Sequence, residues 1–211
     1  MPFDITAVIS IMGLSAVAVF AVSGALDAAR QKMDILGLML IGTATGLGGG
    51  TLRDVLLGKL PVFWIQEPVW IIICLVASAV TYFIAPKLAS RTRALIWMDA
   101  VGIALFAVVG TEIGLKFGTS PLIAVCMGVM TGSFGGIARD LLCGSNLTLM
   151  NEELYITPML VGSVTYLILN TLSLPYSYDL IGGFIVAFSL RALAIQFNIK
   201  LPNMYRKHQD S

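Results

Sequence analysis

Two short stretches place an arginine beside an aspartate within otherwise apolar sequence. The first is GLGGGTLRD, residues 46–54, and the second is GSFGGIARD, residues 132–140. A charged side chain near the centre of a bilayer costs roughly 2.5–3.5 kcal/mol on insertion scales, so such residues face a protein interior or a water-filled cavity. These side chains could therefore gate an aqueous path, or lock helices together through buried ion pairs.

The partner of each arginine stays open at this stage. Positions i and i+1 of a helix point to different faces, so adjacency in sequence does not establish an ion pair. Arg53 could instead reach Asp99 or Asp140 on another helix, and Asp99 could equally be the N-cap of its own helix. The charged candidates for a pore are Arg53, Asp54, Asp99, Arg139 and Asp140.

Glycine accumulates in front of each arginine. A spacing of four residues, as in Gly42, Gly46 and Gly50, is typical of a packing face where backbones approach closely. Additional glycines weaken a helix by about 1 kcal/mol each relative to alanine, so we predict a break that leaves backbone carbonyls facing a polar cavity. Packing alone is the alternative. The candidate hinge residues are Gly46, Gly48, Gly49, Gly50, Gly132, Gly135 and Gly136, and the candidate polar pore residues are Thr45, Thr131 and Ser133.

The elements that must position these residues are membrane helices. Of the 211 residues, 57% are hydrophobic and only 12% are charged, and the mean hydropathy is +0.90. A helix needs about 20 apolar residues to cross the bilayer core. We predict an all-α integral membrane protein with one domain, residues 1–211. Its seven expected spans are residues 6–28, 35–57, 67–85, 96–116, 121–143, 155–173 and 179–198.

The chain also contains an internal duplication. Residues 20–58 align without a gap onto residues 106–144. Matching identical residues include Phe20 and Phe106, Thr45 and Thr131, Arg53 and Arg139, and Gly58 and Gly144. Each copy holds three spans, so the second must enter the membrane from the opposite side. We therefore expect an inverted pair of repeats, about residues 6–85 and 96–173, followed by a seventh helix over about residues 179–198.

Basic residues in short loops predict the orientation, because cytoplasmic loops are enriched in lysine and arginine. The other face would carry only Lys59 and Lys116, so the N-terminus is expected outside and the C-terminus in the cytoplasm. The basic residues on the expected cytoplasmic face are Arg30, Lys32, Lys87, Arg91, Arg93, Lys200, Arg206 and Lys207.

Several function classes are disfavoured. No phosphate-binding loop or nucleophile arrangement is present, the cysteines and the single histidine make no metal-ligand spacing, and the net charge of +1 gives no nucleic-acid surface. We therefore expect no enzyme activity, cofactor, metal or nucleic-acid partner. Of the remaining charges, Arg191 is expected to snorkel to the cytoplasmic side, and Glu112 and Lys116 to form a surface pair.

The repeats resemble those of the bacterial trimeric intracellular cation (TRIC) channel family, whose repeat also carries the label of a putative glycine transporter. The resemblance rests on residues 46–54, on residues 132–140 and on DAVGIALFAVVG, residues 99–110. It implies a homotrimer in the bacterial inner membrane, surrounded by lipid, with a pore for potassium or sodium in each subunit. It also implies that the second and fifth helices line that pore. A secondary transporter for glycine or a similar zwitterion is the alternative function.

Overall fold

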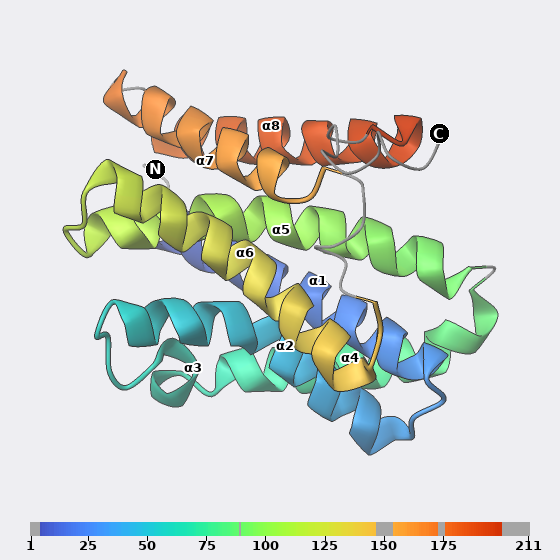
Figure 1. Ribbon diagram of the computed structural model, residues 1–211. Helices are drawn as coiled ribbons and strands as arrows, with labels where there is room; N and C mark the ends of the chain where they lie inside the picture. The colour runs from blue at the N-terminus through green and yellow to red at the C-terminus, as the bar shows by residue number, and fades with distance from the viewer. Residues whose placement is uncertain (1–4, 89, 147–153, 173–175, 200–211) are drawn as a thin grey trace, which may run out of the picture.

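The computed structural model describes residues 5–88, 90–146, 154–172 and 176–199, which are helices joined by short connections (Figure 1). Three basic residues of the orientation prediction, Lys200, Arg206 and Lys207, lie outside these ranges. The α-helices are α1 (Ile5–Arg30), α2 (Ile35–Leu56), α3 (Phe63–Gln66), α4 (Val69–Ile84), α5 (Arg91–Lys116), α6 (Pro121–Cys143), α7 (Ile156–Thr171) and α8 (Tyr176–Phe197). A 3₁₀ turn, η1 (Ala85–Lys87), follows α4.

The predicted spans correspond to α1, α2, α4, α5, α6, α7 and α8. Six of these helices are long and apolar enough to cross a membrane, and α7 is apolar but has only 16 residues. The largest difference from prediction is at α5, which begins at Arg91 because the Ser90 side chain caps it by accepting from the Arg93 amide at 3.2 Å. Asp99 therefore lies inside α5, and its alternative role as an N-cap was wrong.

The helices form two three-helix bundles of opposite orientation. In the first, α1 packs against α2 and α4, and in the second, α5 packs against α6 and α7. Figure 1 shows α1 and α5 side by side but running in opposite directions, with α2 and α6 crossing beside them. Helix α8 lies with α7 on the far side of α5 from α2 and α4. The bundles thus meet along α1, α2, α5 and α6, which is where both arginine motifs lie.

Helices α4 and α7 each carry a stripe of exposed apolar side chains. On α4, Ile72, Val76, Val80 and Phe83 are all exposed and lie three or four residues apart. Helix α7 repeats this pattern with Ile156, Leu160, Val164 and Ile168. Residues at this spacing share one helix face, so α4 and α7 each turn one apolar side outward. By contrast, α5 is the most buried of the membrane helices.

Both glycine-rich helices are continuous, so the prediction of a broken helix was wrong for this structure. Helical hydrogen bonding runs without interruption from Ile35 to Leu56 in α2 and from Pro121 to Cys143 in α6. The physical reason is that the surrounding packing holds these glycines in helical geometry and uses their missing side chains.

The closest approach is at the crossing of α2 and α6. A Cβ atom added at Gly49 would overlap the carbonyl oxygen of Thr131, and one added at Gly135 would overlap the carbonyl oxygen of Thr45. These contacts are equivalent in the two repeats, because Gly49 matches Gly135 and Thr45 matches Thr131. Direct backbone contact of this kind is available only to residues without a side chain. The glycines at the crossing therefore act as packing positions.

Candidate functional site

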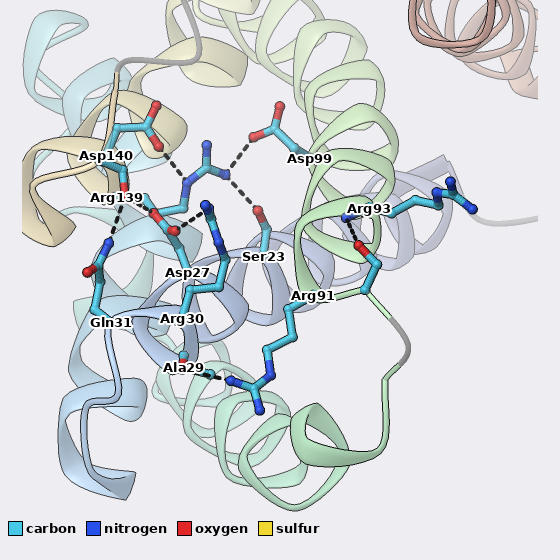
Figure 2. A network of polar contacts seen from close by, with 12 residues as sticks. Ser23, Asp27, Ala29, Arg30, Gln31, Arg91, Arg93, Asp99, Arg139 and Asp140 are labelled. Carbon is cyan, nitrogen blue, oxygen red and sulfur yellow. Dashed lines mark hydrogen bonds and ion pairs between the residues drawn. The ribbon is translucent and has the colours of Figure 1, made fainter.

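Arg139 lies at the centre of a buried polar network (Figure 2). Its Nε donates to Asp140 Oδ1 at 2.8 Å, and its Nη1 donates to Asp99 Oδ1 at 2.8 Å and to Ser23 Oγ at 2.6 Å. These partners come from α6, α5 and α1. Hydrogen bonds between charged groups at these distances are stronger than bonds between neutral groups. Because its partners lie on helices of both bundles, Arg139 links the two bundles. Sequence analysis identified both carboxylates but gave no signal for Ser23.

A second group of polar residues continues the network toward the end of α1. Asp27 is buried and accepts from Arg30 Nη1 at 2.9 Å and from Ser145 Oγ at 2.8 Å. Ser145 in turn accepts from Gln31 Nε2 at 3.4 Å. Figure 2 shows Asp27 on the same side of the bundle as Arg139, one helical turn beyond Ser23. Polar side chains thus extend from the buried arginine toward the loop that joins α1 and α2.

Arg53, the counterpart of Arg139, has a simpler environment. Its Nε and Nη2 donate to Asp54 Oδ1 at 2.9 and 2.6 Å, and the guanidinium lies 5.7 Å from the centre of the Phe63 ring. The other oxygen of Asp54 accepts from the Phe63 amide at 2.9 Å. Arg53 therefore pairs with its sequence neighbour, and the alternative of a contact with Asp99 or Asp140 was wrong. Helix α3 completes this arrangement by placing Phe63 over the pair.

A cavity of about 160 Å³ adjoins Arg53. Its walls come from α1, α2 and α5 together with α3 and the start of α4, and Lys59 and Glu67 from the connecting loops also line it. Gly13, Gly50 and Val109 are also among the residues that line it. The cavity thus combines an interior guanidinium with charged loop residues, which suits water or small ions more than an apolar ligand.

The Arg53 site lacks two polar side chains that the Arg139 site has. In the 86-residue register, Asp99 corresponds to Gly13 and Ser23 corresponds to Val109. Asp99 and Ser23 bind Arg139, whereas Gly13 and Val109 face the space beside Arg53. One arginine is therefore enclosed by hydrogen-bond acceptors, and the other borders open volume.

The other candidate polar residues bond to their own helices. The hydroxyls of Thr45 and Thr131 donate to the carbonyls of Ile41 and Met127, four residues earlier, at 2.7 and 2.6 Å. Ser133 makes the same contact with Val129 at 2.8 Å. Thr45 and Thr131 are fully buried. In this conformation all three hydroxyls satisfy backbone carbonyls, and their role as pore residues stays a prediction.

The remaining hinge candidates lie at helix contacts. A Cβ at Gly46 would come 2.9 Å from the Val17 carbonyl oxygen, and one at Gly132 would come 3.1 Å from that of Ile103. Gly50 faces the Phe63 ring, and Gly136 faces the Tyr155 hydroxyl. Gly48 differs, since nothing approaches its Cβ position closer than 3.8 Å.

Two sequence interpretations outside the motifs were wrong in detail. Arg191 does not snorkel, because it is buried, donates to the Leu154 carbonyl at 2.7 Å and lies 5.4 Å from the Tyr155 ring centre. Glu112 does pair with Lys116, at 3.1 Å, but it is only 2% exposed. The Tyr166 hydroxyl donates to Glu112 from α7. Hydropathy gives no information on such cross-helix partners.

Comparison with known proteins places this geometry in a family. A family model described as "Glycine transporter" matches residues 10–86, which cover most of α1 and all of α2–α4, and residues 96–171, which cover most of α5 and all of α6 and α7. The UPF0126 inner membrane protein YadS of Escherichia coli is 36% identical over 190 residues, covering 88% of this chain and 90% of YadS. The UPF0126 membrane protein YvgT of Bacillus subtilis is 37% identical over 203 residues, covering 92% and 94% of the two chains.

Solved structures agree with these matches. The TRIC trimeric intracellular cation channel orthologue from Rhodobacter sphaeroides superposes with a TM-score of 0.89 at 43% identity, covering 91% of this chain and 99% of the orthologue. The chain belongs to the TRIC-type family. A second structure, described as showing the basis for conductance through TRIC cation channels, gives a TM-score of 0.81 at 31% identity over 92% of this chain and 96% of that one. The TRIC-type fold confirms the predicted fold class of seven membrane helices.

Proposed function

We propose that this TRIC-type protein is a channel for monovalent cations, with potassium as the main ion and passive permeation through each subunit. The observation that carries this proposal is its 43% identity and near-complete superposition with a structure named as a cation channel orthologue. Sodium is the other ion to be tested. The likeness to channels, which are not enzymes, agrees with the lack of catalytic motifs in the sequence.

The proposed pore runs between the two bundles, along α2 and α6, from the Arg53 cavity to the Arg139 network. Its support is the position of the two buried arginines toward opposite ends of the interface. A fixed positive charge opposes cation passage unless carboxylates neutralise it, and each arginine has an aspartate within 2.9 Å. These ion pairs therefore suit gating, in which breaking or re-forming a pair changes the potential along the pore.

We further propose a homotrimer in the bacterial inner membrane, with the N-terminus outside. The relative from Escherichia coli is named an inner membrane protein, and the Rhodobacter sphaeroides orthologue is named trimeric. The orientation rests on the basic residues of the loops. In that orientation, the Arg53 cavity opens toward the outside and the Asp27 group lies toward the cytoplasm.

Purified protein in planar bilayers or potassium-loaded liposomes tests the proposal. We expect unitary potassium currents, and flux that collapses the potassium gradient in liposomes. The family description as a glycine transporter supplies the competing function, a carrier for glycine. If liposomes showed saturable glycine uptake and no potassium current, the carrier function would be supported and the channel function rejected.

Arg139 tests the proposed gate. We expect Arg139→Gln to raise potassium conductance or open probability per folded protein, because it removes a buried positive charge and the contacts that link α6 to α1 and α5. Arg30→Gln is a suitable control, since its side chain is 39% exposed and bonds only locally to Asp27 among its described contacts. Equal currents in Arg139→Gln and the wild type would make the Arg139 network structural only.

A further inference from the structure

We infer that Phe20 and Phe106 together form an apolar plug that closes the path between the Arg53 cavity and the Arg139 network. The inference rests on the proposed function, because it names the residues that block the proposed pore in this conformation. Neither phenylalanine belongs to the arginine or glycine motifs. Both are buried, with exposed fractions of 0% and 3%.

The two rings face each other across the repeat interface. Phe20 on α1 and Phe106 on α5 are matching residues of the duplication, and their ring centres lie 5.1 Å apart in an edge-to-face arrangement. Residues that match in two inverted repeats can touch only near the axis that relates those repeats. The pair therefore lies near the middle of the interface between the repeats.

Phe106 is one of the buried apolar residues that line the Arg53 cavity. It lines that cavity together with Val17 of α1, one turn before Phe20, and Gly50 of α2, one turn before Arg53. Val17 is 1% exposed and Phe106 is 3% exposed, so the cavity ends on tightly packed apolar atoms. An ion or water entering from the Lys59 side therefore meets these side chains beyond Arg53.

Phe20 covers the opposite side of the barrier. A Cβ atom at Gly135 would lie 2.9 Å from Phe20 Cδ2 and Cε2, so the ring rests directly on the backbone of α6. Gly135 is one turn before Arg139, and Phe20 is one turn before Ser23, which accepts the 2.6 Å hydrogen bond from Arg139. The Phe20 and Phe106 rings thus lie next to the Arg139 network, one helical turn from Ser23 on α1.

The chemistry of this barrier is dewetting. Water is unfavourable in a narrow apolar constriction, and a cation that loses its hydration shell there gains no replacement ligand. A phenylalanine side chain offers no hydrogen bond to water or to a hydrated ion, so the closed path excludes both water and cations. Smaller or polar side chains at the same positions leave room for water and join the two polar regions.

Potassium flux from liposomes tests the plug. We expect Phe106→Ala and Phe20→Ala each to raise flux per reconstituted protein about tenfold or more. The milder Phe106→Leu keeps more of the packing and is expected to raise flux less. Phe184→Ala is the matched control, because Phe184 stacks on Phe188 of α8 at 5.9 Å and does not line the cavity. Unchanged flux in folded Phe106→Ala and Phe106→Leu would overturn the plug.

Cysteine labelling gives a second readout that does not depend on conduction. In a background where Cys74, Cys126 and Cys143 are alanine, Ser23→Cys reports whether water reaches the far side of the rings. We expect a water-soluble maleimide to label Ser23→Cys faster when Phe106→Leu is added, and at the original rate when Phe184→Ala is added. No acceleration would overturn the plug. Faster labelling without potassium flux in any variant would support the plug and reject the channel.

Discussion

The regions around Arg53 and Arg139 occupy equivalent places in the two repeats, yet one is open and the other is enclosed. Arg139 donates to Ser23, Asp99 and Asp140, while Arg53 has Asp54 as its carboxylate partner and adjoins a cavity of about 160 Å³. The motif is the same in both copies. Its surroundings therefore decide whether the arginine joins helices together or faces the space beside it.

Two substitutions account for most of this difference. Where the second repeat has Asp99, the first has Gly13, and where the first repeat has Ser23, the second has Val109. The comparison predicts unequal consequences for equivalent mutations.

The largest expected difference comes from removing each guanidinium. Arg139→Met leaves Asp99 and Asp140 buried without their cation, and breaking a buried pair in this way costs about 3–5 kcal/mol of unfolding free energy. Arg53→Met leaves only Asp54, which keeps its bond to the Phe63 amide, so we expect a loss of about 1.5–3 kcal/mol. Equilibrium unfolding in mixed micelles measures both values.

Arg30→Met serves as the control for the loss of an arginine, and we expect a smaller effect because this side chain is partly exposed. Equal losses of unfolding free energy for Arg139→Met and Arg53→Met would contradict the distinction between an enclosed site and an open one. A larger loss for Arg53→Met would mean that the Arg53 site contributes more to stability than the Arg139 site.

Equivalent substitutions at the crossing of α2 and α6 should have similar effects on stability, unlike equivalent substitutions of the two arginines. Gly49→Ala and Gly135→Ala each force a methyl group against a carbonyl oxygen of the other helix, and we expect each to cost about 1–3 kcal/mol of unfolding free energy. Gly48→Ala has room for its methyl group and should gain up to about 1 kcal/mol from higher helix propensity. Thermal unfolding of the three variants provides the comparison.

If Gly48→Ala destabilised the protein as much as Gly49→Ala, flexibility of the glycine run would matter more than close packing. That result would restore the hinge interpretation of the sequence. Different losses for Gly49→Ala and Gly135→Ala would show that the two halves of the crossing are not energetically equivalent.

The smallest expected effect concerns the hydroxyl that the Arg53 site lacks. Val109→Ser places a hydroxyl in the cavity wall near Arg53, at the position that matches Ser23. Val108→Ser buries the same group in the apolar cluster with Tyr166 and Leu180, which should cost about 1–3 kcal/mol. We expect Val109→Ser to lose at least about 1 kcal/mol less than Val108→Ser in chemical unfolding. A greater loss at Val109 would mean that the hydroxyl finds no partner there.

The sequence predicted the helices well, because long apolar segments leave few alternatives to membrane spans. It predicted α6 at residues 121–143, where Pro121 marks the first turn and Gly144 adopts a positive φ of 63° just after the helix. It missed the start of α5, since Arg91 and Arg93 lower the hydropathy of a segment that is nonetheless helical.

The partners of the charged residues were harder to predict. Arg53 and Asp54 pair within one helix although adjacent residues point to different faces, because a long guanidinium bends back to its neighbour. The glycine runs were misread because their composition does not distinguish a break from a close contact. Only the position of Thr131 on another helix makes Gly49 a contact, and an 86-residue offset gives no distance between them.

The order in which the chain is synthesised gives the Arg139 network a consequence for biogenesis. Ser23 and Asp99 leave the ribosome before Arg139 does, and Asp140 follows it immediately. When α6 reaches the translocon, the segments that carry Ser23 and Asp99 have therefore already been synthesised, so two acceptors for its guanidinium are available. Arg53 emerges with only Asp54 beside it, and the Phe63 segment that covers this pair is completed a few residues later.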